Sequence, residues 1–226
     1  DAKRAKVFTK IIRELTVAAR DGGGNPDDNP GLRTVIDKAK AAQMPKDTME
    51  RAIARGAGGD DGADLSAGTE EGYGPGGVAI MVETMTDNKN RTVAEVRHAF
   101  SKAGGNLGTD GSVAYLFDKK GQTQFEPGTP EYEVMEIAIE SGAEDVEADE
   151  DGSISVTTAP EDYLTVKEAL VSGGLEPAAA EVSMIAQTYS DLDMDTGEKV
   201  LRLVEALEDL DDVTDVFTNA SYPDEL

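Results

Sequence analysis

The chain has 226 residues, of which 38% are hydrophobic and 30% charged, and its formal net charge is −25. These values predict one large or two to three small folded domains, and no apolar run reaches the roughly 18 residues needed to cross a membrane. With no cysteine and one histidine, His98, the sequence excludes disulfides, thiol nucleophiles and Cys/His zinc sites. An enzyme that uses metal or carboxylate chemistry through its acidic residues is an alternative, but plentiful acids do not mark a site. We expect no catalytic residues, no cofactor, no bound metal and no enzymatic activity.

The first 58 residues are basic, whereas the rest of the chain is strongly acidic. Residues 1–58 contain 12 Lys and Arg against 8 Asp and Glu, a balance of +4. Residues 59–226 contain the remaining 9 and 38, a balance of −29. A division of this kind is typical of a basic contact module carried by acidic domains. Adaptation of an acidic surface to a salt-rich host is an alternative that the sequence leaves open.

Three amphipathic helices are predicted in the basic stretch. Apolar residues at 3.6-residue spacing predict the first helix over residues 3–20. Asn29 followed by Pro30 predicts the capped start of a second helix. Pro45 opens a third helix, for which Gly56 is the expected C′ glycine. Together they predict a small helical bundle or hairpin.

A different pattern follows these helices. Residues 56–77 are rich in Gly and Asp and are interpreted as an interdomain linker that closes in a turn. The apolar run 78–84 predicts a strand, and Thr92 with Glu95 forms a capping box that predicts the start of a helix. Alternation over 112–118 predicts the next strand.

The remaining elements bring the order β-α-β-β-α-β to almost two copies. They are helices at 130–141, 160–173 and 196–209, strands at 121–126, 144–148, 153–158 and 213–219, and a long strand within 178–189. This order points to two ferredoxin-like α+β units, one inserted in the other. The predicted fold class is α+β with three domains, namely a basic helical domain and linker at 1–70, an α+β domain formed by 71–120 with 185–226, and an inserted acidic α+β domain at 121–184.

Several strings along the whole chain resemble the YebC-like family. They lie at residues 5–15, 36–41, 44–47, 51–53, 55–59, 71–78, 86–97, 104–108 and 207–219. Two positions depart from the usual pattern, because Lys89 stands where Arg is usual and Ala103 where Cys is common. Lys keeps the positive charge but lacks the planar guanidinium that binds a phosphate through two hydrogen bonds. The family also usually has a further basic stretch of roughly twenty residues before the first of these strings.

The resemblance implies a three-domain cytoplasmic regulator of gene expression. Some relatives bind promoter DNA as probable transcriptional regulators, and others act on translation in association with the ribosome, where the bacterial branch is linked to relief of stalling at proline runs. The expected partner is nucleic acid, either DNA or ribosomal RNA, with the ribosome as a further partner, no membrane, and a monomer favoured. A protein-interaction module whose acidic domains bind a partner protein, without nucleic-acid contact, is the alternative.

Phosphate contacts are expected from the cations of the basic helices and from two that precede the predicted helix at 92. On the first helix, five of these cations fall within an arc of about 100° opposite the apolar face. The full set is Lys3, Arg4, Lys6, Lys10, Arg13, Arg20, Lys38, Lys40, Lys46, Arg51, Arg55, Lys89 and Arg91. An ordinary solvated helix face is the alternative. Because no Asn/Gln/Arg triplet at base-reading spacing accompanies these cations, we expect recognition of a phosphate backbone or an RNA shape.

Two loops beside the same predicted helix are candidates for close approach to a phosphate. Residues 87–91 precede a helix N-terminus, where free N–H groups favour an anion. The candidate backbone-approach loop after the helix contains Gly104, Gly105, Asn106 and Gly108, and glycine lets another chain come close. A capped polar loop and simple turn chemistry are the alternatives for the two loops.

Overall fold

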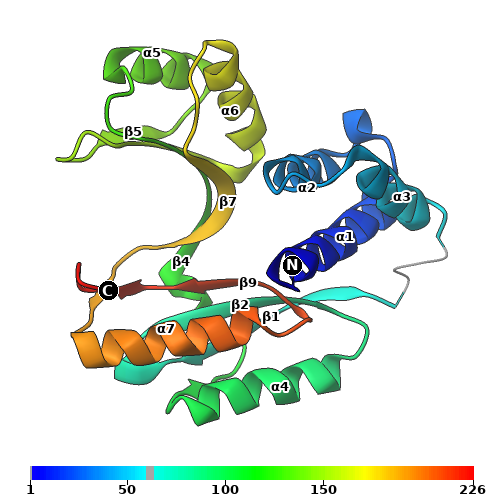
Figure 1. The fold of residues 1–226 in the computed structure, drawn as a ribbon, viewed down its shortest axis with the longest axis vertical. Coiled ribbons are helices and arrows are strands. Elements are labelled where there is room, and N and C mark those ends of the chain that lie inside the picture. The colour runs from blue at the N-terminus through cyan, green and yellow to red at the C-terminus, as the bar shows by residue number, and fades with distance from the viewer. Residues whose placement is uncertain (1, 60–63) are drawn as a thin grey trace. The chain divides into compact units, whose positions relative to one another are not determined.

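The structure is a computed structural model that describes residues 2–59 and 64–226. Three helices form its N-terminal part. They are α1 (Ala2–Gly22), α2 (Pro30–Ala41) and α3 (Lys46–Ala57), with a 3-10 turn at Pro26–Asp28 (Figure 1). Their apolar faces meet in one core, which contains Ile11, Leu15, Leu32, Ala39, Met44, Met49 and Ala52. The three predicted helices are confirmed.

Asn29 ties the end of α1 to the start of α2. Its side-chain oxygen accepts a hydrogen bond from the backbone N–H of Leu32 at 3.1 Å. Its side-chain amide donates to the carbonyl oxygens of Ala18 at 2.9 Å and Gly23 at 2.8 Å. A buried amide needs such partners, and Asn29 is buried. The predicted cap is confirmed, and it also closes the C-terminal end of α1.

Gly56 lies inside α3 and not after its end, so the C′ role predicted for it is wrong. A Cβ atom at Gly56 would lie 2.1 Å from the carbonyl oxygen of Thr16 on α1. Because no real Cβ comes that close to an oxygen, glycine at this position is what lets the two helices approach. The left-handed residue after the helix is Gly59, whose φ is +77°.

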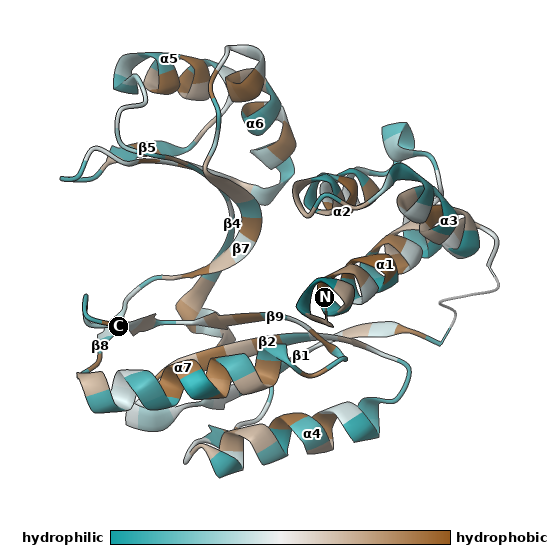
Figure 2. Cartoon of the chain, viewed as in Figure 1, coloured by the Kyte–Doolittle hydropathy of each residue, from teal (hydrophilic) through white to brown (hydrophobic). Residues whose placement is uncertain are grey.

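The first sheet is antiparallel, with strand order β3-β1-β2-β9. Its strands are β1 (Ser66–Tyr73), β2 (Ala79–Thr86), β3 (Asn106–Leu107) and β9 (Val213–Thr218). Helices α4 (Lys89–Lys102) and α7 (Met194–Glu208) lie side by side on one face of this sheet (Figure 1). Their apolar residues, among them Phe100 and Leu203, form a core with Ile80 and Val82 of β2. Figure 2 shows the resulting contrast, with mostly apolar residues on β2 and alternating polar and apolar residues along α7. A short parallel pair joins β8 (Ser190–Asp191) to β10 (Ala220–Ser221).

Three predictions in this region are wrong. Part of the predicted linker at 56–77 is strand β1, which pairs with β2 and β3, while residues 60–63 of that linker lie outside the described residues. Helix α4 begins at Lys89 with Asn88 as its cap, so Thr92 lies inside the helix and no capping box forms there. Within the predicted strand at 112–118, residues 114–116 form a 3-10 turn.

The structure divides into two compact units. One contains the described residues up to Leu116 together with Thr188–Leu226, and the other is Phe117–Gln187. The elements of the second unit are strands β4 (Phe117–Phe125), β5 (Asp145–Ala148), β6 (Ile154–Thr158) and β7 (Ala179–Ala186), and helices α5 (Glu131–Ser141) and α6 (Tyr163–Ser172). Its sheet is antiparallel with order β5-β6-β4-β7, the ferredoxin-like arrangement of a β-α-β-β-α-β chain. The predicted α+β fold class is confirmed.

Both sheets have four antiparallel strands, but the chain connects these strands in a different sequence in each sheet. In the second sheet the strand between β5 and β4 is β6, which follows β5 in the chain. In the first sheet the equivalent place, between β3 and β2, is taken by β1, which precedes both in the chain. The hairpin from β1 to β2 therefore replaces the second hairpin of the usual pattern.

The longest helix of the described residues is α1, with 21 residues, and charged side chains occur along its whole length. No helix within residues 2–59 and 64–226 combines the length and the apolar character needed to cross a bilayer. The helices are instead amphipathic elements with one face in a core.

We predict that Gly56→Ala lowers the free energy of unfolding by about 2 kcal/mol, because the overlap with the Thr16 carbonyl outweighs the gain in helix propensity. Urea-induced unfolding followed by circular dichroism measures the change. Gly31→Ala in α2 is the control, since the nearest atom to its Cβ would be 3.6 Å away. That variant is expected to be as stable as the parent or slightly more stable. Equal effects of the two substitutions would contradict the packing role of Gly56.

Candidate nucleic-acid interface

One side of α1 contacts the C-terminal end of α7. The Lys6 ammonium donates a hydrogen bond to the carbonyl oxygen of Asp209 at 2.8 Å. The Lys10 ammonium donates to the carbonyl oxygen of Glu208. The last carbonyl groups of a helix lack partners within it and form the negative end of its dipole. The two lysines supply both the hydrogen bonds and the positive charge, and burial, followed by the charge of Lys6, lowers the pKa of Lys10.

The carboxylate of Asp212, just before β9, joins α1 and α4 to this end of the sheet. It accepts hydrogen bonds from Nη1 of Arg13 at 2.9 Å and from Oγ1 of Thr92 at 2.8 Å. Arg91 donates to the same carboxylate from Nε at 3.2 Å and from Nη2 at 3.0 Å. The Asp212 side chain is only 3% exposed. Burial on its own raises the pKa of Asp212, but the hydrogen bonds from Thr92, Arg13 and Arg91 together hold the pKa below its usual value.

Asp212 lies at the start of α4, where the sequence predicted an anion. Residues 87–91 form hydrogen bonds with one another, and the Asn88 side chain accepts one from the backbone N–H of Arg91 at 3.1 Å. The Arg91 guanidinium also donates to Asp87 at 2.9 Å. An anion does lie beside this helix N-terminus, and it is a carboxylate of the protein itself. Lys89, by contrast, is exposed.

Two further predicted cations contact other parts of the first unit. Lys38 of α2 donates to Glu14 of α1 at 3.0 Å and lies 3.8 Å from the carboxylate of Asp215 in β9. Burial raises the pKa of both Glu14 and Asp215, and the charge of Lys38 opposes that rise. Arg20 donates to the carbonyl oxygen of Leu65. The contacts with Asp215 and Leu65 hold the helices against β9 and against the chain just before β1.

The other predicted cations are exposed to solvent, and they are Lys3, Arg4, Lys40, Lys46, Arg51, Arg55 and Lys89. The Arg4 guanidinium lies over the ring of Phe8, 5.1 Å from its centroid. The Lys46 side chain is 85% exposed and 3.8 Å from Glu50. Because an exposed pair of this kind is weak, the charge of Lys46 stays available to a ligand. Arg51 and Arg55 are one turn apart on α3 and share a face of that helix.

The glycine loop after α4 packs against the chain itself. Gly104 has a φ of +85° and ends the helix. A Cβ atom at Gly105 would lie 2.3 Å from the carbonyl oxygen of Tyr73 in β1. Asn106 pairs with Tyr73 as part of β3. The close approach that requires glycine here is therefore an approach to β1, and the loop has a role within the sheet.

Glu71 of β1 holds the segment that follows this loop. Its carboxylate accepts hydrogen bonds from the backbone N–H groups of Gly111 at 2.7 Å, Val113 at 3.0 Å and Ala114 at 2.6 Å. Its carbonyl oxygen accepts from the N–H of Gly108 at 2.8 Å. Burial raises the pKa of Glu71, but the three hydrogen bonds to its carboxylate outweigh burial and lower it. The carboxylate fixes the chain just before β4.

Sequence reasoning missed both Glu71 and Asp212. Each follows an acidic neighbour of the same type, Glu70 or Asp211, and nothing in the local sequence marks which of the two is buried. The stripe of cations on the first helix was itself a signal. In a chain with so many acids, such a stripe indicates that an acidic segment of the same chain packs against it. The acidic run 208–212 was a candidate for that contact.

The single histidine and the acidic side chains form no metal-binding cluster in the described part of the chain. His98 is exposed on α4. Within residues 2–59 and 64–226, no three His, Asp or Glu side chains come together in a way that suits a metal ion. The features that the structure does bring together are cations with carboxylates and with helix ends.

We predict that Asp212→Asn lowers the free energy of unfolding at neutral pH by about 2 kcal/mol. This is less than the roughly 3–5 kcal/mol for a fully buried pair, since the Arg91 side chain is 43% exposed. Asp212 has a lowered pKa in the folded state, so its contribution is complete above the unfolded pKa of about 3.9 and is lost as pH falls through the folded value. Urea unfolding at pH 7 and at lower pH measures both effects.

Asp211→Asn is the matched control for that experiment, because Asp211 is exposed and its carboxylate accepts no hydrogen bond from the described residues. Its free energy of unfolding should stay close to that of the parent. Two outcomes would show that the carboxylate does not bind the two guanidinium groups as described. One is an Asp212→Asn variant as stable as the parent at pH 7, and the other is a stability difference from the parent that stays the same at low pH.

Comparison with known proteins places this geometry in a family. The model of the "TACO1/YebC protein N-terminal domain" matches residues 1–59, and the model of the "TACO1/YebC second and third domain" matches residues 66–220. These two ranges correspond to the three helices and to the two sheets with their helices.

Full-length relatives agree with the family models. A protein of Hahella chejuensis is 61% identical over 226 residues, which is 100% of this chain and 91% of the relative. A protein of Coxiella burnetii is 60% identical over 100% of this chain and 93% of its own length, and one of Pseudomonas aeruginosa is 58% identical over 100% and 91%. All three are named probable transcriptional regulatory proteins.

A solved structure shares the fold as well. The crystal structure of a conserved hypothetical protein from Aquifex aeolicus is 46% identical, covers 100% of this chain and 93% of its own, and superposes with a TM-score of 0.86. The family models span both the helices and the sheets, and the relatives span the whole chain. The protein therefore belongs to the TACO1/YebC family.

Proposed function

We propose that this protein regulates gene expression by binding the phosphate backbone of nucleic acid through its N-terminal helices. The relatives from Hahella chejuensis, Coxiella burnetii and Pseudomonas aeruginosa are named as probable transcriptional regulators, which supports a regulatory role. These names describe no catalytic activity, and we infer that the protein acts by binding and not as an enzyme.

The observation that carries the proposal is the position of the exposed cations. Lys40 on α2, and Arg51 and Arg55 on α3, face solvent in the basic part of a chain that elsewhere repels phosphate. Exposed Lys and Arg side chains on helices supply affinity for a phosphate backbone by releasing its counterions. They position a nucleic acid without reading its bases. A DNA backbone or a folded RNA, including ribosomal RNA, fits this surface better than one operator sequence does.

The cations of α1 have a second task in this proposal. Arg13 is bound to the buried Asp212 and orients the helix. Lys10 is bound to the end of α7, so a phosphate at this position competes with that contact. The Lys6 side chain is 45% exposed. It can therefore bind a phosphate while it stays beside Asp209. Lys3, which is also exposed, extends the surface toward the N-terminus.

The second candidate function is that of a protein-interaction module without nucleic-acid contact. One observation favours it, because Lys6, Lys10 and Arg13 already contact the chain's own acidic segment 208–212, which runs from the last residue of α7 to the start of β9. In that case the basic face of α1 serves folding alone, and a partner protein binds the acidic units. The same binding experiment separates the two candidates.

We predict that the double substitution Lys40→Glu with Arg51→Glu weakens binding to a labelled DNA duplex and to an RNA hairpin about tenfold or more. The loss of two phosphate contacts should also make the slope of log K against log salt on duplex DNA shallower by about 2. Fluorescence anisotropy at several salt concentrations measures both quantities, and sedimentation of lysate through sucrose shows whether the protein travels with DNA or with ribosomes.

The matched control is Arg97→Glu with Lys119→Glu, which makes the same charge change at exposed positions outside the N-terminal helices. It should bind within about threefold of the parent, because its long-range effect is screened by salt. Equal losses in the two variants would show that net charge alone matters and would contradict the proposed surface. A parent protein that binds neither nucleic acid would leave the interaction module as the function.

A further inference from the structure

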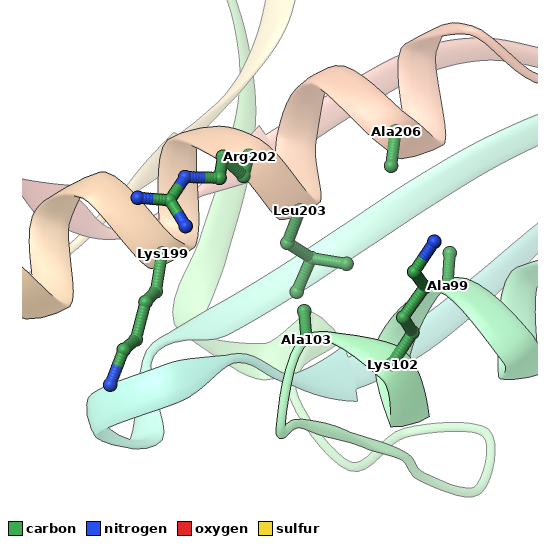
Figure 3. Close-up of a pocket in the computed structure, with 7 residues that line it drawn as sticks. All are labelled: Ala99, Lys102, Ala103, Lys199, Arg202, Leu203 and Ala206. Carbon is green, nitrogen blue, oxygen red and sulfur yellow. The ribbon is translucent and has the colours of Figure 1, made fainter.

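A solvent-open groove runs between α4 and α7, with a volume of about 490 Å³. Its floor is apolar, with Ala99 on α4 and Ala103 directly after α4 opposite Leu203 and Ala206 on α7 (Figure 3). Three of these four side chains are only methyl groups, so the groove has room for larger apolar side chains of a ligand.

Three cations form the rim of this groove, namely Lys102 on α4 and Lys199 and Arg202 on α7 (Figure 3). Lys199 is 3.3 Å from Asp195, and Arg202 is 3.5 Å from Glu198. Both are exposed pairs between successive turns of one helix, which are weak and easily exchanged. Lys102 has no ion pair with any described residue. We call the four floor residues and these three cations the cationic groove.

The second unit carries a surface of opposite character on α5. Tyr132, Met135 and Ile139 are 77%, 36% and 62% exposed. Their spacing of three and four residues places them on one face of the helix, and Glu136 and Glu140 lie among them. We call these five residues the acidic stripe. Isolated exposed apolar residues are ordinary, but a continuous stripe of them marks an interaction site.

We propose that the cationic groove of one copy of this protein binds the acidic stripe of a second copy. The three large apolar side chains of the stripe fill the space above the alanine floor, and its two glutamates meet the cationic rim. Residues 117–187 contain 17 Asp and Glu against 3 Lys, a balance of −14. The second unit of one copy is therefore attracted to the cations of the other at contact distance.

The chemistry of the groove favours a helix over a nucleic acid as its occupant. Its floor has no aromatic side chain on which a base could stack and no hydrogen-bond donor that could read one. Its cations are confined to the rim, where they suit carboxylates beside an apolar surface. The overall charge of −25 opposes association at long range, but salt at physiological strength screens this repulsion beyond about 8 Å.

The groove and the stripe are different surfaces, so each copy offers one of each to its neighbours. Such a head-to-tail contact leaves a free groove and a free stripe at the ends of an assembly, which grows or closes into a ring. One short helix in one groove buries less than the roughly 800 Å² per partner of a standard stable interface. We therefore expect weak association, with a dissociation constant of about 10–100 μM.

Sedimentation velocity of the full chain from about 5 to 300 μM tests the proposal at constant salt, and the sedimentation coefficient should rise over this range. Lys102→Glu with Arg202→Glu reverses the groove, and Glu136→Lys with Glu140→Lys reverses the stripe. Each pair should weaken association about tenfold or more through like-charge contacts. A chain that carries all four substitutions should regain association to within about threefold of the parent, since its charges match again.

Arg97→Glu with Lys119→Glu is the control for the groove, and Glu150→Lys with Glu176→Lys is the control for the stripe, as all four residues are exposed elsewhere. Circular dichroism verifies that every variant is folded. A parent chain that stays monomeric throughout overturns the proposal, and so does association that either reversal leaves unchanged. Failure of the fourfold variant to regain association also overturns it. None of these measurements involves nucleic acid, so their outcome is independent of the proposed function.

Discussion

A buried carboxylate, that of Asp212, is the constraint on which the first unit depends. Removing a carboxylate from water is costly unless hydrogen bonds and positive charge replace the water. Arg13 and Arg91 supply the charge, and Thr92 supplies a further hydrogen bond. Arg13 belongs to α1, and Arg91 and Thr92 belong to α4. The hydrogen bonds that Asp212 needs therefore fix both helices against β9, which begins at the next residue. The positions of the exposed cations on α2 and α3 depend on that arrangement, since both helices pack on α1.

The basic face of α1 illustrates how one set of charges serves folding and function together. A stripe of lysines in an acidic chain is readily interpreted as a phosphate site, and part of it instead binds the carbonyl end of α7. That contact gives the helix end the positive charge that its dipole favours. A ligand for α1 must compete with it, whereas a ligand for α2 and α3 meets cations that already face water. The helices thus present two classes of cation with different availability.

Hydrophobic periodicity predicted most helices and the strands that face a core, because burial imposes a period on those elements. It missed β1, whose residues 66–69 are exposed and whose sequence is rich in Gly, Ser, Thr and Glu. It also could not place Glu71 or Asp212, since burial of an acid depends on partners far away in the chain. The predicted cations were found by type and spacing alone. Which of them contact protein could be known only from the tertiary fold, as Arg13 and Arg91 show.

The pairing of β2 with β9 has a consequence for the order of events during synthesis. Ile80 pairs with Thr218, and the whole of Phe117–Gln187 is made between them. All strands of that second unit lie within its own segment, so it can fold while β2 is paired with β1 but still lacks β9 on its other side. The acids at 208–212 are likewise made only after the whole of that unit. A nascent chain therefore exposes Lys6, Lys10 and Arg13 until the segment at 208–212 has been made.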